Sequence, residues 1–432
     1  MSRPNDTSPA HRVIPGGAHT YSKGDDQFPI NAPRFLERGE GVWVWDDAGN
    51  RFLDWTMGLR SMTLGYGYRP VDDAAIEQIR KGSNFGRPSR IEHELAEEII
   101  DLIPCAEMVK YAKHGSVVTT AGVKLARAVT GRPYVAFCKD HPFFSYDDWF
   151  IGTTEANAGV PEAHYQYSLP FRYNDISSLE TQFTAHPGEI AAVILEACTT
   201  DEPVDDFLGK VRSLCTREGA VMILDEMITG FRWDLRGAQS YFGVTPDLAT
   251  FGKGMANGYS VSALVGRRDI MELGGIQHDK PRVFLISTTH GAENHCLAAA
   301  RASLAAYRTL PVIEHIWTTG RALMDGMNRA AQDAGVADQF AVVGYPCRPE
   351  IVCRDAKDGI SLPLRTLFMQ EMVRRGVLLS YIVPSCSHDD EHVALSVEAT
   401  RAALNVYARA LEDGWEAHLD GAPIKQVFRV FN

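Results

Sequence analysis

The sequence predicts an α/β protein with a large domain, built on a mostly parallel β-sheet covered by helices, and a smaller α/β domain. From about residue 108, short apolar runs alternate with helical patterns. The apolar runs are continuous rather than alternating, which indicates strands buried on both faces and therefore a parallel sheet. At 432 residues the chain is also too long for one ordinary core.

The predicted elements follow in order along the chain. The N-terminal part has one predicted hairpin, Gly41–Trp55, in which Asp-Ala-Gly-Asn turns between two β-rich runs. The predicted strands of the large domain are Met108–Ala112, Tyr134–Cys138, Ala191–Cys198, Ala220–Asp225 and Ala263–Gly266. The predicted helices between them are Thr119–Thr130, Ile176–Thr184 and Phe207–Glu218. Further apolar runs at Gln339–Val343 and Gly376–Val383 lie among helix-like stretches.

These patterns predict three regions. Residues 61–310 form the large domain, and residues 311–432 form most of the small domain. Residues 1–60 are expected to contribute to the small domain.

Composition excludes several classes of protein. The hydrophobic share of 45% is typical of a globular protein, and the net charge of -12 without clustered basic residues argues against nucleic acid as a partner. The polar N-terminus has no apolar signal region, and no apolar stretch reaches the length of a membrane span. Eight cysteines without paired spacing indicate reduced thiols. We therefore expect a cytoplasmic protein that does not bind membranes.

The strongest chemical signal is a lysine, Lys253, between two glycines in Thr250-Phe-Gly-Lys-Gly-Met-Ala-Asn-Gly258, preceded in sequence by an aspartate, Asp225, at the end of an apolar strand. A lysine amine can form a Schiff base with the aldehyde of pyridoxal phosphate (PLP), and a carboxylate can keep the pyridine nitrogen of PLP protonated. Two other interpretations remain: Lys253 as a solvated lysine on a turn, and Asp225 as a helix cap or a partner of Arg232. The two residues together favour the PLP interpretation.

A Gly-Ser turn follows the first strand of the large domain. There Gly115, Ser116 and Val117 open a predicted helix, and free backbone N–H groups at a helix start suit a phosphate. The alternative is an ordinary strand-to-helix turn capped by Ser116 or Thr119.

These motifs resemble the class III, fold type I PLP enzymes, and within them the branch of the glutamate-1-semialdehyde aminomutases. The resemblance rests on Phe251–Gly266, Leu224–Arg232 and Ile14–Gly17, and it extends from about residue 12 to the C-terminus. It implies a seven-stranded, mostly parallel sheet, Lys253 as the Schiff-base lysine, Asp225 as the partner of the pyridine nitrogen, and the Gly-Ser turn as the phosphate cup. It also implies a homodimer with a shared site, residues 1–60 in the dimer contact, and Thr288 at the phosphate of the neighbouring subunit.

Some positions depart from the pattern of this family. His141 stands where an aromatic residue stacks on the cofactor ring, with Phe143 or Phe144 as substitutes. Lys23 stands near the place of an arginine that binds the substrate carboxylate in the aminomutases, and lysine offers a point charge rather than a fork of donors. Whether Lys23, Arg60 or another basic residue receives an acid group of the substrate stays open.

The expected reaction is transfer of an amino group from an amino-acid donor to an aldehyde or ketone. The segment Phe143–Gly152 resembles aminotransferases of glycan or secondary-metabolite biosynthesis. An intramolecular 2,1-aminomutase is the first alternative, and a non-catalytic dimer of the same fold is the second. A dinucleotide-binding protein is disfavoured because the sequence has no Gly-x-Gly-x-x-Gly after an early strand.

No metal is expected. The run Ser387–His392 contains possible ligands but also reads as a helix start with acidic residues in its first turn. His290 and His295 flank Glu293, and we expect them to line a dimer contact or the mouth of the site.

Overall fold

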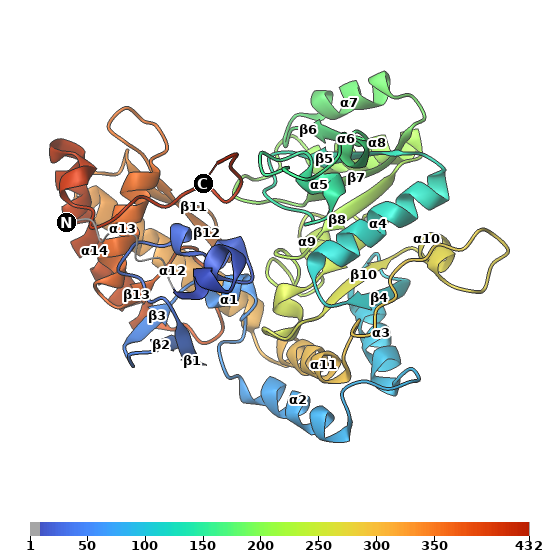
Figure 1. Cartoon of the computed structure of the whole chain (residues 1–432), viewed down its shortest axis with the longest axis horizontal. Coiled ribbons are helices and arrows are strands. Elements are labelled where there is room, and N and C mark those ends of the chain that lie inside the picture. Colours follow the sequence, from blue (N-terminus) through green and yellow to red (C-terminus); the bar gives the residue numbers. More distant parts are fainter. Residues whose placement is uncertain (1–8, 432) are drawn as a thin grey trace. The chain divides into compact units, whose positions relative to one another are not determined.

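The computed structural model describes residues 9–431, which divide into two compact units. One unit is Arg69–Ile313, and the other joins the described residues up to Tyr68 with those from Glu314 onward. Figure 1 shows the elements of both units. Among the described residues, no helix combines the length and the apolar character that crossing a bilayer requires.

The unit Arg69–Ile313 is built on a seven-stranded sheet with the strand order β4-β10-β9-β8-β7-β5-β6. All neighbouring pairs are parallel except those of β10, which runs antiparallel to β4 and β9. The mostly parallel sheet predicted from the continuous apolar runs is therefore confirmed. Its strands are β4 (Met108–Ala112), β5 (Tyr134–Cys138), β6 (Ser168–Phe171), β7 (Ile190–Glu196), β8 (Val221–Asp225), β9 (Leu248–Phe251) and β10 (Ser262–Gly266).

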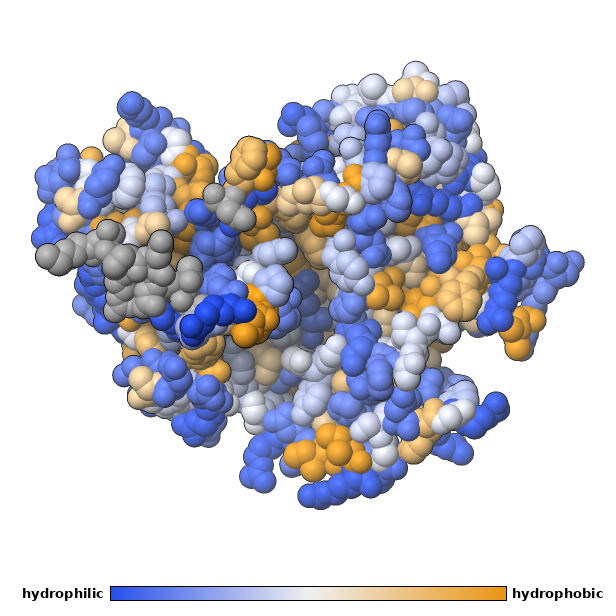
Figure 2. All heavy atoms as spheres, in the orientation of Figure 1, coloured by the Kyte–Doolittle hydropathy of each residue, from blue (hydrophilic) through white to orange (hydrophobic). Residues whose placement is uncertain are grey.

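Helices cover this sheet, and α4 packs across β7, β9 and β10 (Figure 1). Helix α11 packs against α2 and against the short helix η5 that carries Lys253. Figure 2 shows an apolar patch over α2, the helix on which Ile76 and Ile79 are exposed. The helices are α2 (Arg69–Lys81), α3 (Arg90–Leu102), α4 (Gly115–Thr130), α5 (Asp148–Ile151), α6 (Glu162–Tyr165), α7 (Ile176–Ala185), α8 (Phe207–Glu218), α9 (Ala238–Tyr241), η5 (Lys253–Ala256), α10 (Arg268–Met271), η6 (Glu272–Gly274) and α11 (Asn294–Thr309).

Five strands and three helices of this unit were predicted, and all of them form with small shifts at their ends. Strands β6 and β9 were not predicted as strands. Each has only four residues, and β6 contains Pro170, so neither gives the longer apolar run by which a buried strand is recognised.

The other unit has a four-stranded sheet in the order β1-β2-β3-β13 and a separate β11-β12 pair. The predicted hairpin Gly41–Trp55 is confirmed as the antiparallel pair of β2 and β3. The core of this unit includes the buried rings of Trp55, Phe340, Phe368 and Tyr407. The elements are η1 (Pro9–Arg12), η2 (Pro15–Gly17), η3 (Tyr21–Lys23), η4 (Asp25–Gln27), β1 (Leu36–Glu40), β2 (Trp43–Asp46), β3 (Arg51–Asp54), α1 (Met57–Arg60), α12 (Val312–Asp333), β11 (Phe340–Tyr345), β12 (Arg348–Cys353), α13 (Leu362–Val373), β13 (Val377–Leu378), α14 (Asp390–Asp413) and η7 (Trp415–Ala417).

Two runs singled out in the sequence lie in this unit, and the predicted helix start is confirmed. Of the run Gly376–Val383, only Val377 and Leu378 form a strand, because the residues after them continue as a buried loop. The run Ser387–His392 does begin a helix, α14, but Asp389 caps it: the Asp389 carboxylate accepts the N–H groups of Glu391 and His392.

A left-handed turn is the most strained segment of this unit. Residues 57–60 all have positive φ, between 44° and 74°, although three of them are not glycine. Such a conformation costs about 1–2 kcal/mol per L-residue. Buried Asp54 holds the turn by accepting the N–H groups of Thr56 and Met57, and Tyr66 connects it further, since its hydroxyl donates to Asp54 Oδ2 (2.6 Å) and accepts the N–H of Gly58 (2.9 Å).

We predict that Tyr66→Phe lowers the free energy of unfolding by about 1.5–3 kcal/mol, because it removes a hydrogen bond to a buried carboxylate whose pKa burial already raises. Tyr241→Phe is the control, since Tyr241 is 47% exposed. Urea unfolding of both variants measures the difference, and equal stabilities would contradict the role of Tyr66 in bracing the turn.

Candidate active site

The carboxyl ends of neighbouring parallel strands bring the predicted site residues to one edge of the sheet. Glu196 on β7 is paired in register with Asp225 on β8, and Asp225 is paired with Thr250 on β9. Lys253 follows β9 by two residues. Ligands of open α/β sheets bind at this edge, and the geometry therefore supports a site there.

Asp225 is a buried carboxylate with an incomplete set of partners. Its side chain is 3% exposed, and its Oδ1 accepts the N–H of Met227 (2.9 Å) and the hydroxyl of Thr250 (3.0 Å). Burial raises the pKa of Asp225, while the charge of Lys253 and the two hydrogen bonds lower it. The alternative that Asp225 pairs with Arg232 does not form among the described residues, because the hydrogen bonds to Asp225 come from Met227 and Thr250 and the neighbouring charge is that of Lys253.

Lys253 lies on a short helix in a strained conformation. Its φ is 44°, in the left-handed region, and its side chain is half-buried rather than fully solvated. Tyr307 on α11 braces the turn by donating its hydroxyl hydrogen to the carbonyl of Gly254. A non-glycine residue held at positive φ by its surroundings is typical of functional sites.

Met227 joins three parts of the site. Its N–H bonds to Asp225, and its sulfur lies where a side chain on either of two glycines would collide. A Cβ added to Gly115 would lie 2.9 Å from Met227 Sδ, and one added to Gly252 would lie 2.7 Å from the same atom. Because neither glycine has a side chain, the turn at Gly115 and the turn at Lys253 can both pack against the thioether of Met227.

The predicted phosphate cup stands at the start of α4. The first residue of the helix is Gly115, and the cap position is His114, which makes no side-chain cap bond, so the alternative of a cap by Ser116 or Thr119 is wrong. The hydroxyl of Ser116 accepts the N–H of Tyr146 (3.1 Å), which leaves its own hydrogen for an anion. The N–H of Val117 reaches the His114 carbonyl at 3.3 Å, so Gly115 and Ser116 are the better placed donors.

His141 is buried at the same edge of the sheet. Its Nδ1 accepts the backbone N–H of Glu196 (3.0 Å), and because a backbone amide can only donate, Nδ1 carries no proton. The imidazole is 2% exposed and lies at an angle against the rings of Tyr173 and Phe144. Phe143, one of the predicted substitutes, is 44% exposed. Which of these rings covers the cofactor stays a prediction.

Thr288 is exposed on the segment between η6 and α11. The same segment ends at Glu293, whose carboxylate forms an ion pair with Lys113 of the strand end before the cup (2.6 Å). This ion pair connects the segment of Thr288 to the phosphate turn. The contact of Thr288 with a second subunit stays a prediction about the dimer.

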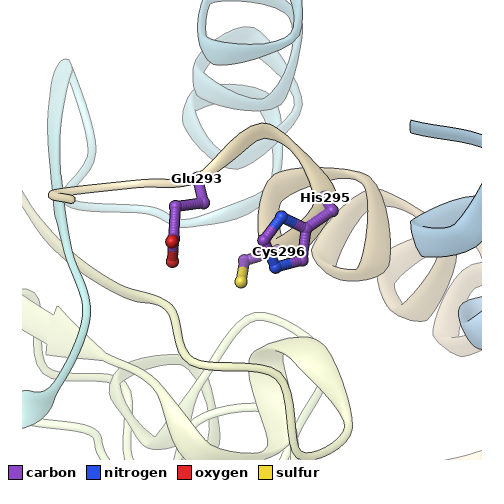
Figure 3. A group of neighbouring side chains, drawn as sticks. All are labelled: Glu293, His295 and Cys296. Carbon is purple, nitrogen blue, oxygen red and sulfur yellow. The ribbon is translucent and has the colours of Figure 1, made fainter. Parts of the chain in front are cut away.

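Glu293, His295 and Cys296 form a group whose possible ligand atoms lie within 4.8 Å of one another (Figure 3). Lys113 already neutralises the carboxylate of Glu293, and this contact is the main reason why the pKa of Glu293 is lowered. A cation would have to displace an ammonium group at the start of a helix, where the dipole also disfavours it. The group therefore favours an ion pair with Lys113 over a metal.

The two candidates for binding an acid group of the substrate belong to the other unit. Lys23 is exposed on η3. Arg60 ends the left-handed turn, and its guanidinium lies over the ring of Tyr381 at 4.2 Å. The role of each residue stays open.

The residues of the edge fit PLP. Asp225 Oδ2 receives no hydrogen bond from the part of the chain that the structure describes, so it can accept the N–H of a pyridinium. Gly115 and Ser116 present donors to a phosphate, and Lys253 is close enough to Asp225 for its charge to act on the pKa of this carboxyl. Sequence reasoning missed Met227 and Thr250, because the first needs the packing of two turns and the second needs the strand register.

Comparisons with known proteins agree with this geometry. Residues 21–404 match the family model of the class-III aminotransferases. The 3-aminobutyryl-CoA aminotransferase of Cloacimonas acidaminovorans is 32% identical, over 91% of this chain and 94% of its own. The glutamate-1-semialdehyde 2,1-aminomutase of Syntrophobacter fumaroxidans is 31% identical, over 93% and 96%. The FumI protein of Sphingopyxis sp. MTA144, in a PLP-containing form, superposes with a TM-score of 0.85 at 27% identity, over 96% of this chain and 97% of its own.

We predict that Gly115→Ala weakens PLP binding by about tenfold, because the new Cβ would lie 2.9 Å from Met227 Sδ, and the shift needed to relieve this contact disturbs the start of α4. Gly122→Ala on the same helix is the matched control, since its Cβ would meet only ordinary contacts at 3.5 Å. Titration of both apoproteins with PLP measures the two Kd values. The same Kd for both variants would contradict the proposed role of the glycine.

Proposed function

We propose that this chain, which belongs to the class-III aminotransferases, moves an amino group from an amino-acid donor to a separate aldehyde or ketone acceptor. The family and the relatives make it a PLP-dependent enzyme of the aminotransferase and aminomutase group. The observation that carries the proposal is the placement of Asp225 and Lys253 at the ends of adjacent parallel strands.

Each residue of the edge has a defined task. PLP, when bound, supplies an aldehyde that carries the amino group and a ring that accepts electrons from the substrate carbon. Asp225 Oδ2 holds the proton of the pyridine nitrogen, and the N–H groups of Gly115 and Ser116 hold the phosphate. Lys253 Nζ would serve as the base that takes the proton from the substrate carbon and returns it.

Assembly and location are further parts of the proposal. We propose a homodimer in which Thr288 of one subunit reaches the phosphate site of its partner, and residues 1–60 belong to the contact. Exposure of Thr288 and of Val13, Ile14 and Tyr21 supports a contact of this kind. We also propose that the protein is cytoplasmic, which eight cysteines outside any disulfide, seven of them buried, support.

The acceptor is proposed to belong to glycan or secondary-metabolite biosynthesis. The relatives named above act on a 3-amino acyl thioester and on a semialdehyde by their names, so both compound classes belong in the test as well. The alternative is a 2,1-aminomutase, which moves the amino group within one molecule.

We predict that Lys253→Ala lowers kcat for amino-group transfer by about 10²- to 10⁴-fold, because the variant lacks the amine that we propose as the proton carrier. The same variant should lose the visible absorbance band of the lysine-bound cofactor. Lys110→Ala, at an exposed position of β4, serves as control. Unchanged turnover in Lys253→Ala would contradict the assignment, and a wild-type protein that stays colourless with PLP would favour the non-catalytic dimer.

We predict that the wild-type protein transfers nitrogen between two separate molecules. A ¹⁵N-labelled amino-acid donor is incubated with oxo-sugars, cyclic ketones, semialdehydes and a 3-oxoacyl thioester, and mass spectrometry then shows which acceptor gains the label. Activity confined to glutamate-1-semialdehyde, without uptake of label from a second molecule, would instead establish the aminomutase.

A further inference from the structure

Thr250 lies between the two residues that the reaction needs. It is fully buried on β9, opposite Asp225 in the parallel register and three residues before Lys253. Its hydroxyl donates to Asp225 Oδ1 (3.0 Å), and its carbonyl accepts the N–H of Glu226 (2.9 Å). Thr250 therefore contacts both the carboxylate of Asp225 and the backbone immediately after it.

The two donors to Asp225 reach the same oxygen atom. The N–H of Met227 and the hydroxyl of Thr250 both bond to Oδ1, at 2.9 Å and 3.0 Å. Within residues 9–431 no donor bonds to Oδ2. Two bonds to Oδ1 restrict the rotation of the carboxylate and leave Oδ2 for another donor. They also stabilise the charged form of a carboxylate that burial destabilises.

We propose that Thr250 is a positioning residue whose hydroxyl keeps Asp225 oriented and ionised, so that the proton shared with the pyridine nitrogen stays on the nitrogen. This inference rests on the proposed function, because it concerns the same site. Without the hydroxyl, the carboxylate of Asp225 binds the proton more tightly. The proton then moves from the nitrogen to Oδ2, and the ring becomes a weaker acceptor of electrons.

The test uses holoenzyme reconstituted with PLP labelled with ¹⁵N in the ring. The ¹⁵N chemical shift distinguishes a protonated from an unprotonated pyridine nitrogen without any turnover. We expect a protonated nitrogen in the wild type, a shift toward the unprotonated form in Thr250→Val, and recovery in Thr250→Ser. We also expect kcat of Thr250→Val to fall about tenfold with KM nearly unchanged, because a hydrogen bond to a charged group is lost.

Thr229→Val is the matched control. Thr229 is as buried as Thr250, and its hydroxyl donates to Glu226 Oε2 (3.1 Å), the carboxylate of the residue after Asp225. Like Thr250→Val, this variant removes a hydroxyl that donates to a buried carboxylate. The carboxylate of Glu226, however, also accepts the N–H groups of Ala238 and Gln239 and the side-chain amide of Gln239. We expect its thermal stability to fall while the ¹⁵N shift stays at the wild-type value.

A protonated nitrogen in Thr250→Val would overturn the proposal, even if the variant were less stable or bound PLP more weakly. A shift of equal size in Thr229→Val would also overturn it, since the effect would then be general loosening. If Thr250→Val does not fold, Thr250→Ala carries the same expectation. A wild-type enzyme that holds PLP with a protonated nitrogen but transfers no amino group would contradict the proposed function alone.

Discussion

The site depends on the parallel pairing of β7, β8 and β9. This pairing sets Glu196, Asp225 and Thr250 side by side at the carboxyl edge of the sheet. Successive residues of a strand point to opposite faces, so a slip of one residue would turn Asp225 away from its neighbours. The strands β7 and β8 are apolar and buried along their whole length, so packing on both faces holds them inside the sheet.

Two adjacent buried carboxylates at this edge, Asp225 and Glu226, have different roles. Glu226 is fully buried, and its oxygens accept the Thr229 hydroxyl, the N–H groups of Ala238 and Gln239, and the side-chain amide of Gln239. These bonds fold the loop that leads into α9. Asp225 has donors on one oxygen only. Glu226, whose two oxygens both accept hydrogen bonds, therefore shapes the loop. Asp225, next to it, has one oxygen without a donor among the described residues, and this oxygen can bind the cofactor.

The amino-acid sequence predicted the chemistry better than the contacts that support it. Lys253 between glycines and Asp225 at a strand end are local patterns, and the strands that carry the large domain are long enough to recognise. Thr250 was part of the motif, but its bond to Asp225 depends on the register of a four-residue strand that was not predicted. His141 was expected at the cofactor ring from its place in the motif, and its bond to the Glu196 amide follows only from the fold.

Met227 connects the turn at Gly115 with the turn at Lys253. The turns at Gly115 and Gly252 are about 140 residues apart in sequence, yet a Cβ on either glycine would lie 2.9 Å or 2.7 Å from its sulfur, and its N–H donates to Asp225. Groups that act together in a reaction must keep fixed distances, and interior packing is rigid enough to maintain them. A polarizable, unbranched side chain fills the irregular space between the two turns without demanding a fixed shape. The positive φ of Lys253 is therefore held next to a side chain that also binds Asp225 and lies against the turn of Gly115.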